Sequence, residues 1–272
     1  MRAYITLLST PDYLPGVACL AASLQRTGTH IPLVVAVSAG LPQATRNALT
    51  TMPGVAQVLP LPADGLLPGW AVQQHHHWAY TFDKLWLFGL DQFSKLVYLD
   101  CDMVVLQNID DLFNAPHMAA VDAGRLVNSD WIRLNSGLMV IEPKAELPQR
   151  IATTLEMARD EMQRDGRPAL GDQDLINSFY ADWSREGPHL DQGDNCFFDY
   201  VDAYLDTGLY ALPGRLTRGT TRGLRVVHFA GRYKPWMPRA RLRNALALLR
   251  GRMGPGQREV LRTYGELLRR VP

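Results

Sequence analysis

Short apolar runs alternate with helical patterns along the first hundred residues of this chain. Unbroken apolar runs indicate strands that are buried on both faces, and the segments between them carry apolar residues at helical spacing. Strands that alternate with helices predict a Rossmann-like α/β fold, with a mainly parallel sheet and helices on both faces. We expect strands at 3–8, 32–37, 55–61 and 95–99, and helices at 14–24, 42–51 and 80–90.

The rest of the chain has a more mixed pattern. No internal repeat or clear linker precedes residue 238, so the sequence predicts one α/β domain over 1–238 and a helical appendage over 239–272. The segment 188–222 is expected to be mainly loop with short strands. The other expected elements are strands at 118–121, 137–141 and 224–228, and helices at 148–164 and 171–180.

Composition narrows the class of protein. The chain has 272 residues, 47% of them hydrophobic and 20% charged, which is ordinary for a globular protein. No uncharged apolar run approaches the length of a membrane span, and the alternating start does not resemble a signal peptide. The three cysteines are far apart and predict neither a disulfide framework nor a zinc site. These features predict a cytoplasmic protein.

Two carboxylates follow the strand expected at 95–99. Residues i and i+2 of an extended chain point to the same side, so Asp100 and Asp102 can converge on one point. Two hard oxygen donors suit Mn²⁺ or Mg²⁺ better than zinc, and such ions often also bind the phosphates of a substrate. Nucleotides bind at this end of a strand in open α/β sheets. The alternative is a solvated pair of turn carboxylates.

Five motifs in order give the chain a resemblance to a known family. It resembles glycosyltransferase family 8, which includes glycogenin, galactinol synthase and bacterial lipopolysaccharide galactosyltransferases, over roughly residues 3–236. The resemblance implies a GT-A fold, a UDP-hexose donor, Mn²⁺ and retention at the anomeric carbon. The motifs are Leu99-Asp100-Cys101-Asp102, Asn108-Ile109-Asp110-Asp111-Leu112-Phe113, Leu134-Asn135-Ser136-Gly137, Gly171-Asp172-Gln173-Asp174-Leu175-Ile176-Asn177 and His228-Phe229-Ala230-Gly231-Arg232-Tyr233-Lys234-Pro235-Trp236.

The resemblance implies roles for the charged residues near the two carboxylates. Asp100, Asp102 and His228 would hold a metal that neutralises the diphosphate of the leaving UDP. Gly231 and Lys234 match diphosphate contacts, because glycine lets the backbone approach a phosphate and lysine supplies a compact positive charge. The alternatives are an ordinary histidine at a strand end and a solvated lysine in a turn.

Further residues match the donor site of the family. The end of the first strand would cradle uridine and ribose, with Tyr13 stacking on the base; the alternative is a helix N-cap. Lys84 would touch the donor, or else lie on a helix surface. The expected donor-binding set is Leu7, Ser9, Thr10, Tyr13, Lys84, Asp100, Cys101, Asn135, Ser136, Gly137, Gly231 and Lys234.

Asp172 and Gln173 match the pair that the family places near the reactive face of the sugar. Retention requires either a protein nucleophile or front-side attack within an ion pair. An amide is a poor nucleophile, so we expect Gln173 nearest the anomeric carbon, where it orients the sugar or stabilises positive charge. Asp172 is expected to bind the donor sugar. The alternative is that Asp172 and Asp174 only favour a helix start.

The acceptor stays open between a glycan, a glycolipid and a polyol. Tyr200, Tyr204 and Tyr210 match no priming tyrosine, which disfavours self-glucosylation. The turn at 191–195 is expected either to line the acceptor side or to be a plain surface turn. Residues 75–78, three histidines and a tryptophan, are expected to form a loop near the donor, since three consecutive histidines cannot face one ion. A catalytically silent sugar-nucleotide or glycan-binding protein is the alternative function.

The C-terminal segment is basic and amphipathic. Nine arginines oppose two glutamates between residues 239 and 270. Two alternatives remain: binding to an anionic surface at the inner membrane face, or packing on the domain with a solvated basic side. Nucleic-acid binding is not expected, because no basic-aromatic recognition module accompanies the arginines. The apolar stripes comprise Leu242, Ala245, Leu246 and Leu249, then Val260, Leu261, Tyr264, Leu267 and Leu268.

Overall fold

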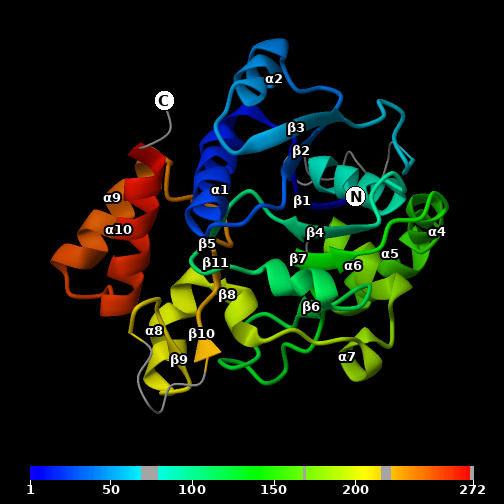
Figure 1. The fold of residues 1–272 in the computed structure, drawn as a ribbon. Helices are drawn as coiled ribbons and strands as arrows, with labels where there is room; N and C mark the ends of the chain where they lie inside the picture. The colour runs from blue at the N-terminus through cyan, green and yellow to red at the C-terminus, as the bar shows by residue number, and fades with distance from the viewer. Residues whose placement is uncertain (69–78, 168–169, 216–221, 270–272) are drawn as a thin grey trace.

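A computed structural model describes residues 1–272 except 69–78, 168–169, 216–221 and 270–272 (Figure 1). Its centre is a six-stranded sheet in the order β3-β2-β1-β4-β7-β6. The first four of these strands are parallel; β7 is antiparallel to β4, and β6 is antiparallel to β7, which confirms the predicted mainly parallel sheet. The strands are β1 (Arg2–Leu8), β2 (Leu33–Val37), β3 (Val55–Pro60), β4 (Lys95–Leu99), β6 (Ala120–Val121) and β7 (Asn135–Ile141).

Helices cover both faces of this sheet, as predicted (Figure 1). Side chains alternate along a strand, so neighbouring residues of β1 enter different cores. Ile5 packs with Leu85 and Leu175 on one face, whereas Tyr4 packs with Leu20 and Leu24 on the other. The first face carries η2 (Ala79–Gly89), α4 (Leu147–Ala152), α5 (Leu155–Arg164) and α6 (Asp172–Phe179), and the second carries α1 (Leu14–Arg26) and α2 (Gln43–Thr50).

A second, smaller sheet lies beside the first. Its order is β5-β11-β8, with β11 antiparallel to β5 and parallel to β8. The predicted last core strand, at 224–228, therefore belongs to this sheet and not to the central one, and β5 was not predicted at all. The strands are β5 (Met103–Val105), β8 (Cys196–Phe197) and β11 (Val226–His228).

Three predicted elements need correction. The helix predicted at 148–164 is broken, because Thr153 and Thr154 donate their hydroxyls to the carbonyls of Arg150 and Ile151, both at 2.7 Å, and so compete with the helical ladder. The helix predicted at 80–90 is a 3₁₀ helix, η2. The segment 188–222, predicted as mainly loop with short strands, has the strands β9 (Tyr210–Ala211) and β10 (Arg222–Gly223) but also the helices η4 (Gln192–Asp194), η5 (Phe198–Tyr200) and α8 (Val201–Asp206). A further short helix, α7 (Trp183–Glu186), precedes this segment. Two further short 3₁₀ helices are η1 (Pro11–Tyr13) and η3 (Asp110–Asn114).

Two helices end the chain, α9 (Pro238–Leu249) and α10 (Pro255–Arg269), and both lie at one edge of the molecule (Figure 1). α10 contacts α1 and α8, and its Val260, Tyr264 and Leu267 are buried. α9 buries only Ala240. The division of the chain at residue 238 stays a prediction. Within the described ranges, no helix is both long and apolar enough for a membrane crossing.

Candidate metal and donor site

The loop between β4 and β5 brings two carboxylates to the carboxyl end of the sheet. The Asp100 N–H donates to the Gly137 carbonyl at 2.8 Å, which ties the start of the loop to β7. The Met103 N–H donates to the Asp100 carbonyl at 3.2 Å and closes a turn. Asp100 and Asp102 therefore flank a turn instead of lying on one extended strand, but their side chains still converge.

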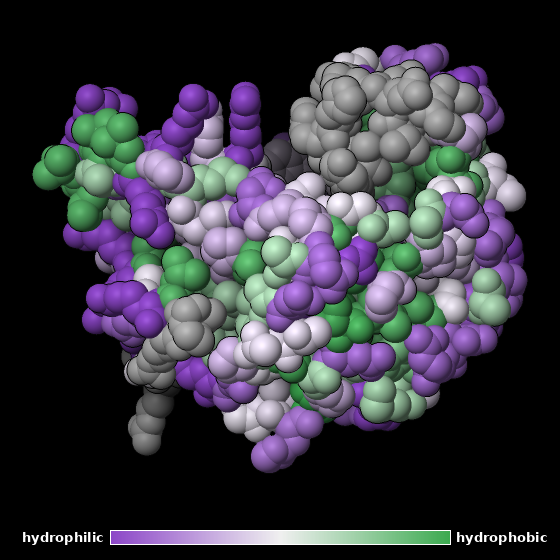
Figure 2. Space-filling model, turned by 90° about the horizontal axis from the view of Figure 1, so that it is seen from above, coloured by the Kyte–Doolittle hydropathy of each residue, from purple (hydrophilic) through white to green (hydrophobic). Residues whose placement is uncertain are grey.

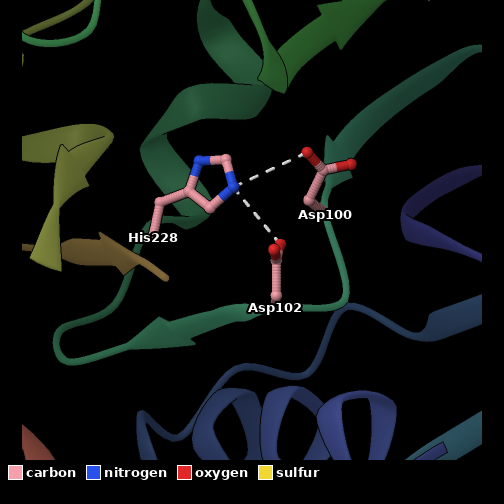
Figure 3. A group of neighbouring side chains, drawn as sticks. All are labelled: Asp100, Asp102 and His228. Atoms are coloured by element: carbon pink, nitrogen blue, oxygen red, sulfur yellow. Dashed lines mark ion pairs between the residues drawn. The ribbon is translucent and has the colours of Figure 1, made fainter. Parts of the chain in front are cut away.

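Asp100, Asp102 and His228 form a compact cluster (Figure 3). His228 Nε2 lies 3.2 Å from Asp102 Oδ1 and 3.8 Å from Asp100 Oδ2. Adjacent ligands of an octahedral ion, with bonds of about 2.1 Å, lie about 3 Å apart. The cluster therefore fits a divalent cation such as Mn²⁺ or Mg²⁺, for which carboxylate and imidazole are acceptable ligands.

Asn195 orients the imidazole of His228. Its Oδ1 lies 3.2 Å from His228 Nδ1, and its Nδ2 donates to Asn135 Oδ1 at 2.8 Å. Because an amide oxygen only accepts, His228 Nδ1 is the donor in this contact, which turns Nε2 toward the cluster. The 191–195 segment was predicted to be acceptor-lining or plain surface, so this role of a fully buried asparagine was missed.

Lys84 is buried between two carboxylates, which excludes the alternative of a surface lysine. Its Nζ lies 2.8 Å from Asp172 Oδ2 and 3.2 Å from Asp100 Oδ1. Burial disfavours the charge, but Asp100 and Asp172 outweigh burial and hold the pKa of Lys84 above its ordinary value. The Tyr98 hydroxyl donates to the same Asp100 Oδ1 at 2.5 Å, a contact that the sequence did not predict. Asp100 thus keeps Oδ2 for the cluster.

Ser136 joins the start of β7 to the start of α6. Its hydroxyl donates to Asp172 Oδ2 at 2.8 Å, and its N–H donates to Gln173 Oε1 at 3.1 Å. Asp172 and Gln173 consequently lie beside the cluster. Lys84 links Asp172 to Asp100, and the Ser136 N–H of β7 holds Gln173. The Gln173 carbonyl has one lone pair bound to the backbone and one left for a ligand.

Asp174 has a different role from Asp172. Its Oδ2 accepts from the Gly171 N–H at 2.9 Å, and its Oδ1 pairs with Arg167 and, at 3.4 Å, with Arg133. This is the helix-start role that the sequence left open for both residues, and Asp174 alone performs it through its side chain. Asp172 instead faces Lys84.

Lys234 forms an ion pair with one of the cluster carboxylates. Its Nζ lies 2.5 Å from Asp102 Oδ2 and donates to the Phe229 carbonyl at 3.0 Å. Burial raises the pKa of Asp102, but His228 and Lys234 outweigh burial and hold it well below its usual range. Lys234 is buried, so it is not the solvated turn lysine of the alternative. Gly231 has a φ of 94°, which favours glycine.

The segment that follows β1 lies next to Lys234. Lys234 Nζ is 5.8 Å from the centroid of the Tyr13 ring, and Tyr13 packs edge-on against Trp236 at 5.6 Å. The Trp236 indole donates to the Asp12 carbonyl at 2.8 Å, which fastens the His228–Trp236 segment to residues 7–13. The structure therefore brings the predicted uridine segment and the predicted diphosphate segment together.

The remaining members of the predicted set have different environments. Leu7 has its side chain in the core, while Ser9 accepts from the Ser38 hydroxyl at 2.8 Å and Thr10 donates to Asp12 at 2.5 Å. Burial, with the nearby carboxylates Asp102 and Asp100, raises the pKa of Cys101, so its thiol stays neutral.

Gly137 makes room for the cluster. A Cβ on this residue would lie 2.8 Å from both His228 Cε1 and Met103 Cε. Side chains essentially never approach this closely, so any larger residue would displace the imidazole.

The predicted histidine-rich loop at 75–78 lies outside the described residues.

A central mainly parallel sheet, helices on both faces and a carboxylate-imidazole cluster at the strand ends define an α/β protein with GT-A architecture. The fold agrees with a crystal structure of an active-site mutant of LgtC, at a TM-score of 0.64 and 17% identity, covering 100% of this chain and 96% of that one. GlyE from Streptococcus pneumoniae TIGR4 gives 0.59 and 17%, covering 99% and 63%. These likenesses support the fold.

The chain belongs to glycosyl transferase family 8, whose model matches residues 4–240. It is 30% identical over 237 residues to glycogenin-1 of Homo sapiens, covering 86% of this chain and 62% of that protein. It is also 29% identical over 255 residues to inositol phosphorylceramide glucuronosyltransferase 1 of Arabidopsis thaliana, covering 86% and 42%. The chain thus spans less than two thirds of these relatives. The family resemblance inferred from the five motifs is confirmed.

Proposed function

We propose that this protein is a retaining glycosyltransferase that moves glucose or galactose from a UDP-sugar to a hydroxyl acceptor. The observation that carries the proposal is the cluster of Asp100, Asp102 and His228, placed beside Lys234 at the carboxyl end of the sheet. These three side chains would hold Mn²⁺, or Mg²⁺. When bound, the ion neutralises charge on the diphosphate as UDP leaves.

The chain's own residues would bind the nucleotide on the β1 side of the cluster. Tyr13 is half-buried against Trp236 and would stack on uracil, while Ser9 and Thr10 would contact the ribose or base. Lys234 would exchange its ion pair with Asp102 for the diphosphate once a cation neutralises that carboxylate. The exposed, left-handed Gly231 would let the backbone approach the same phosphates.

The donor sugar would lie over β7 and the start of α6. Asn135, Ser136 and Gly137 open β7 there, and Asp172 and Gln173 open α6. Asp172 is held by Lys84 at 2.8 Å, which lowers its nucleophilicity and favours a role in binding sugar hydroxyls. Gln173 would use its second carbonyl lone pair to stabilise positive charge at the anomeric carbon.

The acceptor would be a glycan, a glycolipid or a polyol. One relative is named for inositol phosphorylceramide, so lipid-linked acceptors belong in any assay. Self-glucosylation as in glycogenin is disfavoured at two of the three tyrosines considered, because Tyr204 and Tyr210 are buried. Galactinol-like transfer to a polyol stays an alternative.

Hydrolysis of UDP-sugars without an acceptor tests the proposal. The purified protein is incubated with Mn²⁺ and UDP-glucose, UDP-galactose, UDP-glucuronate or UDP-N-acetylglucosamine, and released UDP is measured. We expect slow release from UDP-glucose or UDP-galactose, abolished by EDTA. Asp102→Asn should reduce this rate about a thousandfold or more, since it removes one metal ligand while keeping the shape of the side chain.

Asp160→Asn is the matched control, because Asp160 is an exposed carboxylate on α5. It should hydrolyse at the wild-type rate. UDP binding without hydrolysis of any sugar, with or without saccharide acceptors, would favour the catalytically silent binding protein. An unchanged rate in Asp102→Asn would contradict the metal assignment.

We further propose that α9 places the protein against an anionic membrane. In a bacterium this would be the cytoplasmic face of the inner membrane. Leu242 is 63% and Leu249 81% exposed, and Arg239, Arg241, Arg243 and Arg250 around them are exposed as well. Figure 2 shows hydrophobic and hydrophilic surfaces side by side at this edge of the molecule. Leucines insert between lipids while arginines attract anionic headgroups, at about 1 kcal/mol for each cation near the surface.

A further inference from the structure

The loop between β6 and β7 exposes a group of large apolar side chains next to the cluster. Leu126, Val127, Trp131 and Ile132 are 40 to 45% exposed. The loop starts directly after Val121, which pairs with Asn135 in the sheet, so it begins and ends beside the metal site. Nothing in the roles assigned above uses this surface.

A row of aromatic rings connects this loop with the cluster. The Trp131 and Tyr200 ring centroids are 5.9 Å apart, those of Tyr200 and Phe197 6.2 Å, and those of Phe197 and His228 5.6 Å. Gly124 has a φ of 89°, and a Cβ there would overlap the Trp131 ring. The indole therefore lies against backbone on one side and remains 40% exposed.

An open cavity lies where the start of this loop meets residues 189 and 192. The cavity has a volume of about 320 Å³ and is lined by Asp122, Arg125, Leu126, His189 and Gln192. Arg125 Nη1 donates to Asp122 Oδ2 at 2.8 Å, and His189 Nδ1 lies 3.7 Å from the same oxygen. Gln192 is bound to Asp122 and to the Tyr204 hydroxyl, so the Arg125 guanidinium and the His189 imidazole are the accessible polar groups for ring hydroxyls.

We infer that this loop, with Phe197 and Tyr200, forms the acceptor site and binds a saccharide of at least two rings, one of which stacks on Trp131. The inference rests on the proposed function and adds the substrate class. The Tyr13 side of the cluster would hold the nucleotide, so the acceptor reaches the donor sugar from the opposite, His228 side.

A saccharide fits this surface better than a lipid tail does. One face of a sugar ring presents C–H groups that pack on a flat aromatic ring, while its edge presents hydroxyls to polar partners. The loop offers both within a few residues, from Asp122 to Trp131. α9 differs in that it exposes leucines and arginines but no aromatic ring.

Acceptor kinetics of matched variants test the inference. With the donor identified by hydrolysis, transfer is measured to methyl glucoside, methyl galactoside, lactose, maltose, cellobiose and inositol, and to octyl glucoside. We expect a disaccharide to be a better acceptor than any single ring. Trp131→Ala should raise the acceptor KM tenfold or more, while the donor KM changes less than twofold, and Trp131→Phe should recover most of the loss.

Met157→Ala serves as the control, since Met157 is 47% exposed on α5, a helix that carries none of the residues assigned to the site. It should leave both KM values unchanged. The inference is overturned if Trp131→Ala leaves the acceptor KM unchanged, if its effect is confined to octyl glucoside, or if a protein that hydrolyses its donor transfers to no saccharide tested. Absence of donor hydrolysis in the wild type would instead refute the proposed function.

Discussion

The two C-terminal helices both carry arginines and an apolar stripe, but the stripes have opposite environments. The α10 stripe is buried, with Val260 at 1%, Tyr264 at 3% and Leu267 at 2% exposure, whereas Leu242 and Leu249 of α9 are largely exposed. A helical apolar stripe thus shows which face seeks burial, and the neighbouring elements decide whether burial occurs.

The difference matters for the site because α10 supports it. Tyr264 stacks on Trp236 at 6.3 Å and contacts Phe229 edge-on at 5.1 Å. These two residues flank Lys234 and follow His228, in the segment proposed to hold the metal and the phosphates. α10 therefore supports the segment from His228 to Trp236, whereas α9 leaves Leu242 and Leu249 exposed.

Removal of the Tyr264 ring should have the largest effect on stability. Tyr264→Ala leaves a cavity beneath Trp236 and is expected to cost about 3–5 kcal/mol of unfolding free energy, and to lower hydrolytic activity. Tyr264→Phe keeps the ring and should stay within about 1.5 kcal/mol. Urea unfolding measures both. If Tyr264→Ala unfolded like the wild type, α10 would be a dispensable appendage.

A methyl group at Gly16 should disturb the cluster through Trp236 and the Cys101 backbone. A Cβ there would lie 2.5 Å from the Cys101 carbonyl and 2.7 Å from the Trp236 ring. We expect Gly16→Ala to destabilise the fold by about 1–3 kcal/mol and to weaken Mn²⁺ activation. Gly40→Ala, where the space is open, is the control. Equal Mn²⁺ dependence in both variants would contradict the prediction, because it would show that the packing of Trp236 does not influence the metal site.

Loss of the α8 carboxylate that binds the start of α10 should have a smaller effect on stability. Asp202 accepts from the Gly256 N–H at 2.7 Å and the Gln257 N–H at 3.1 Å, and so docks α10 on α8. Asp202→Ala should cost about 0.5–2 kcal/mol, as for other helix caps. Asp206→Ala removes an exposed carboxylate of the same helix and should be neutral. The prediction fails if the two variants unfold at the same urea concentration.

Changes on α9 should have the smallest effect on stability. Leu242→Ser with Leu249→Ser is expected to change the unfolding free energy by less than about 0.5 kcal/mol, because both side chains are exposed. The same variant should sediment at least tenfold less with vesicles of phosphatidylglycerol and phosphatidylcholine. Wild-type protein should not sediment with phosphatidylcholine alone. Equal sedimentation of variant and wild type would refute membrane binding through α9.

The sequence predicted the central sheet well because the signal is local. Buried parallel strands such as β1 and β2 are continuous apolar runs, and a helix such as α1 repeats its apolar residues every three or four positions. The break between α4 and α5 was missed, since it depends on how Thr153 and Thr154 use their hydroxyls. α8 and β5 were missed because short elements depend on contacts with distant segments.

For the site, the motifs predicted which residues meet but not how each is held. Asp100, Asp102 and His228 converge as expected, although the two carboxylates flank a turn. The hydrogen bonds of Asn195 with His228 and of Tyr98 with Asp100 lie outside any motif. Asp172 and Asp174 are alike in sequence, yet Asp172 faces Lys84 and Asp174 caps its own helix.

By itself, the sequence determined the alternation of strands and helices in the first hundred residues, the family and the residues that gather at the strand ends. Each of these is encoded in local periodicity or in a short motif. Only the tertiary structure decided which amphipathic helix is buried, which carboxylate meets a lysine and which aromatic rings form a row from Trp131 to His228. Those outcomes depend on segments far apart in the chain, where packing of one surface against another supplies the free energy.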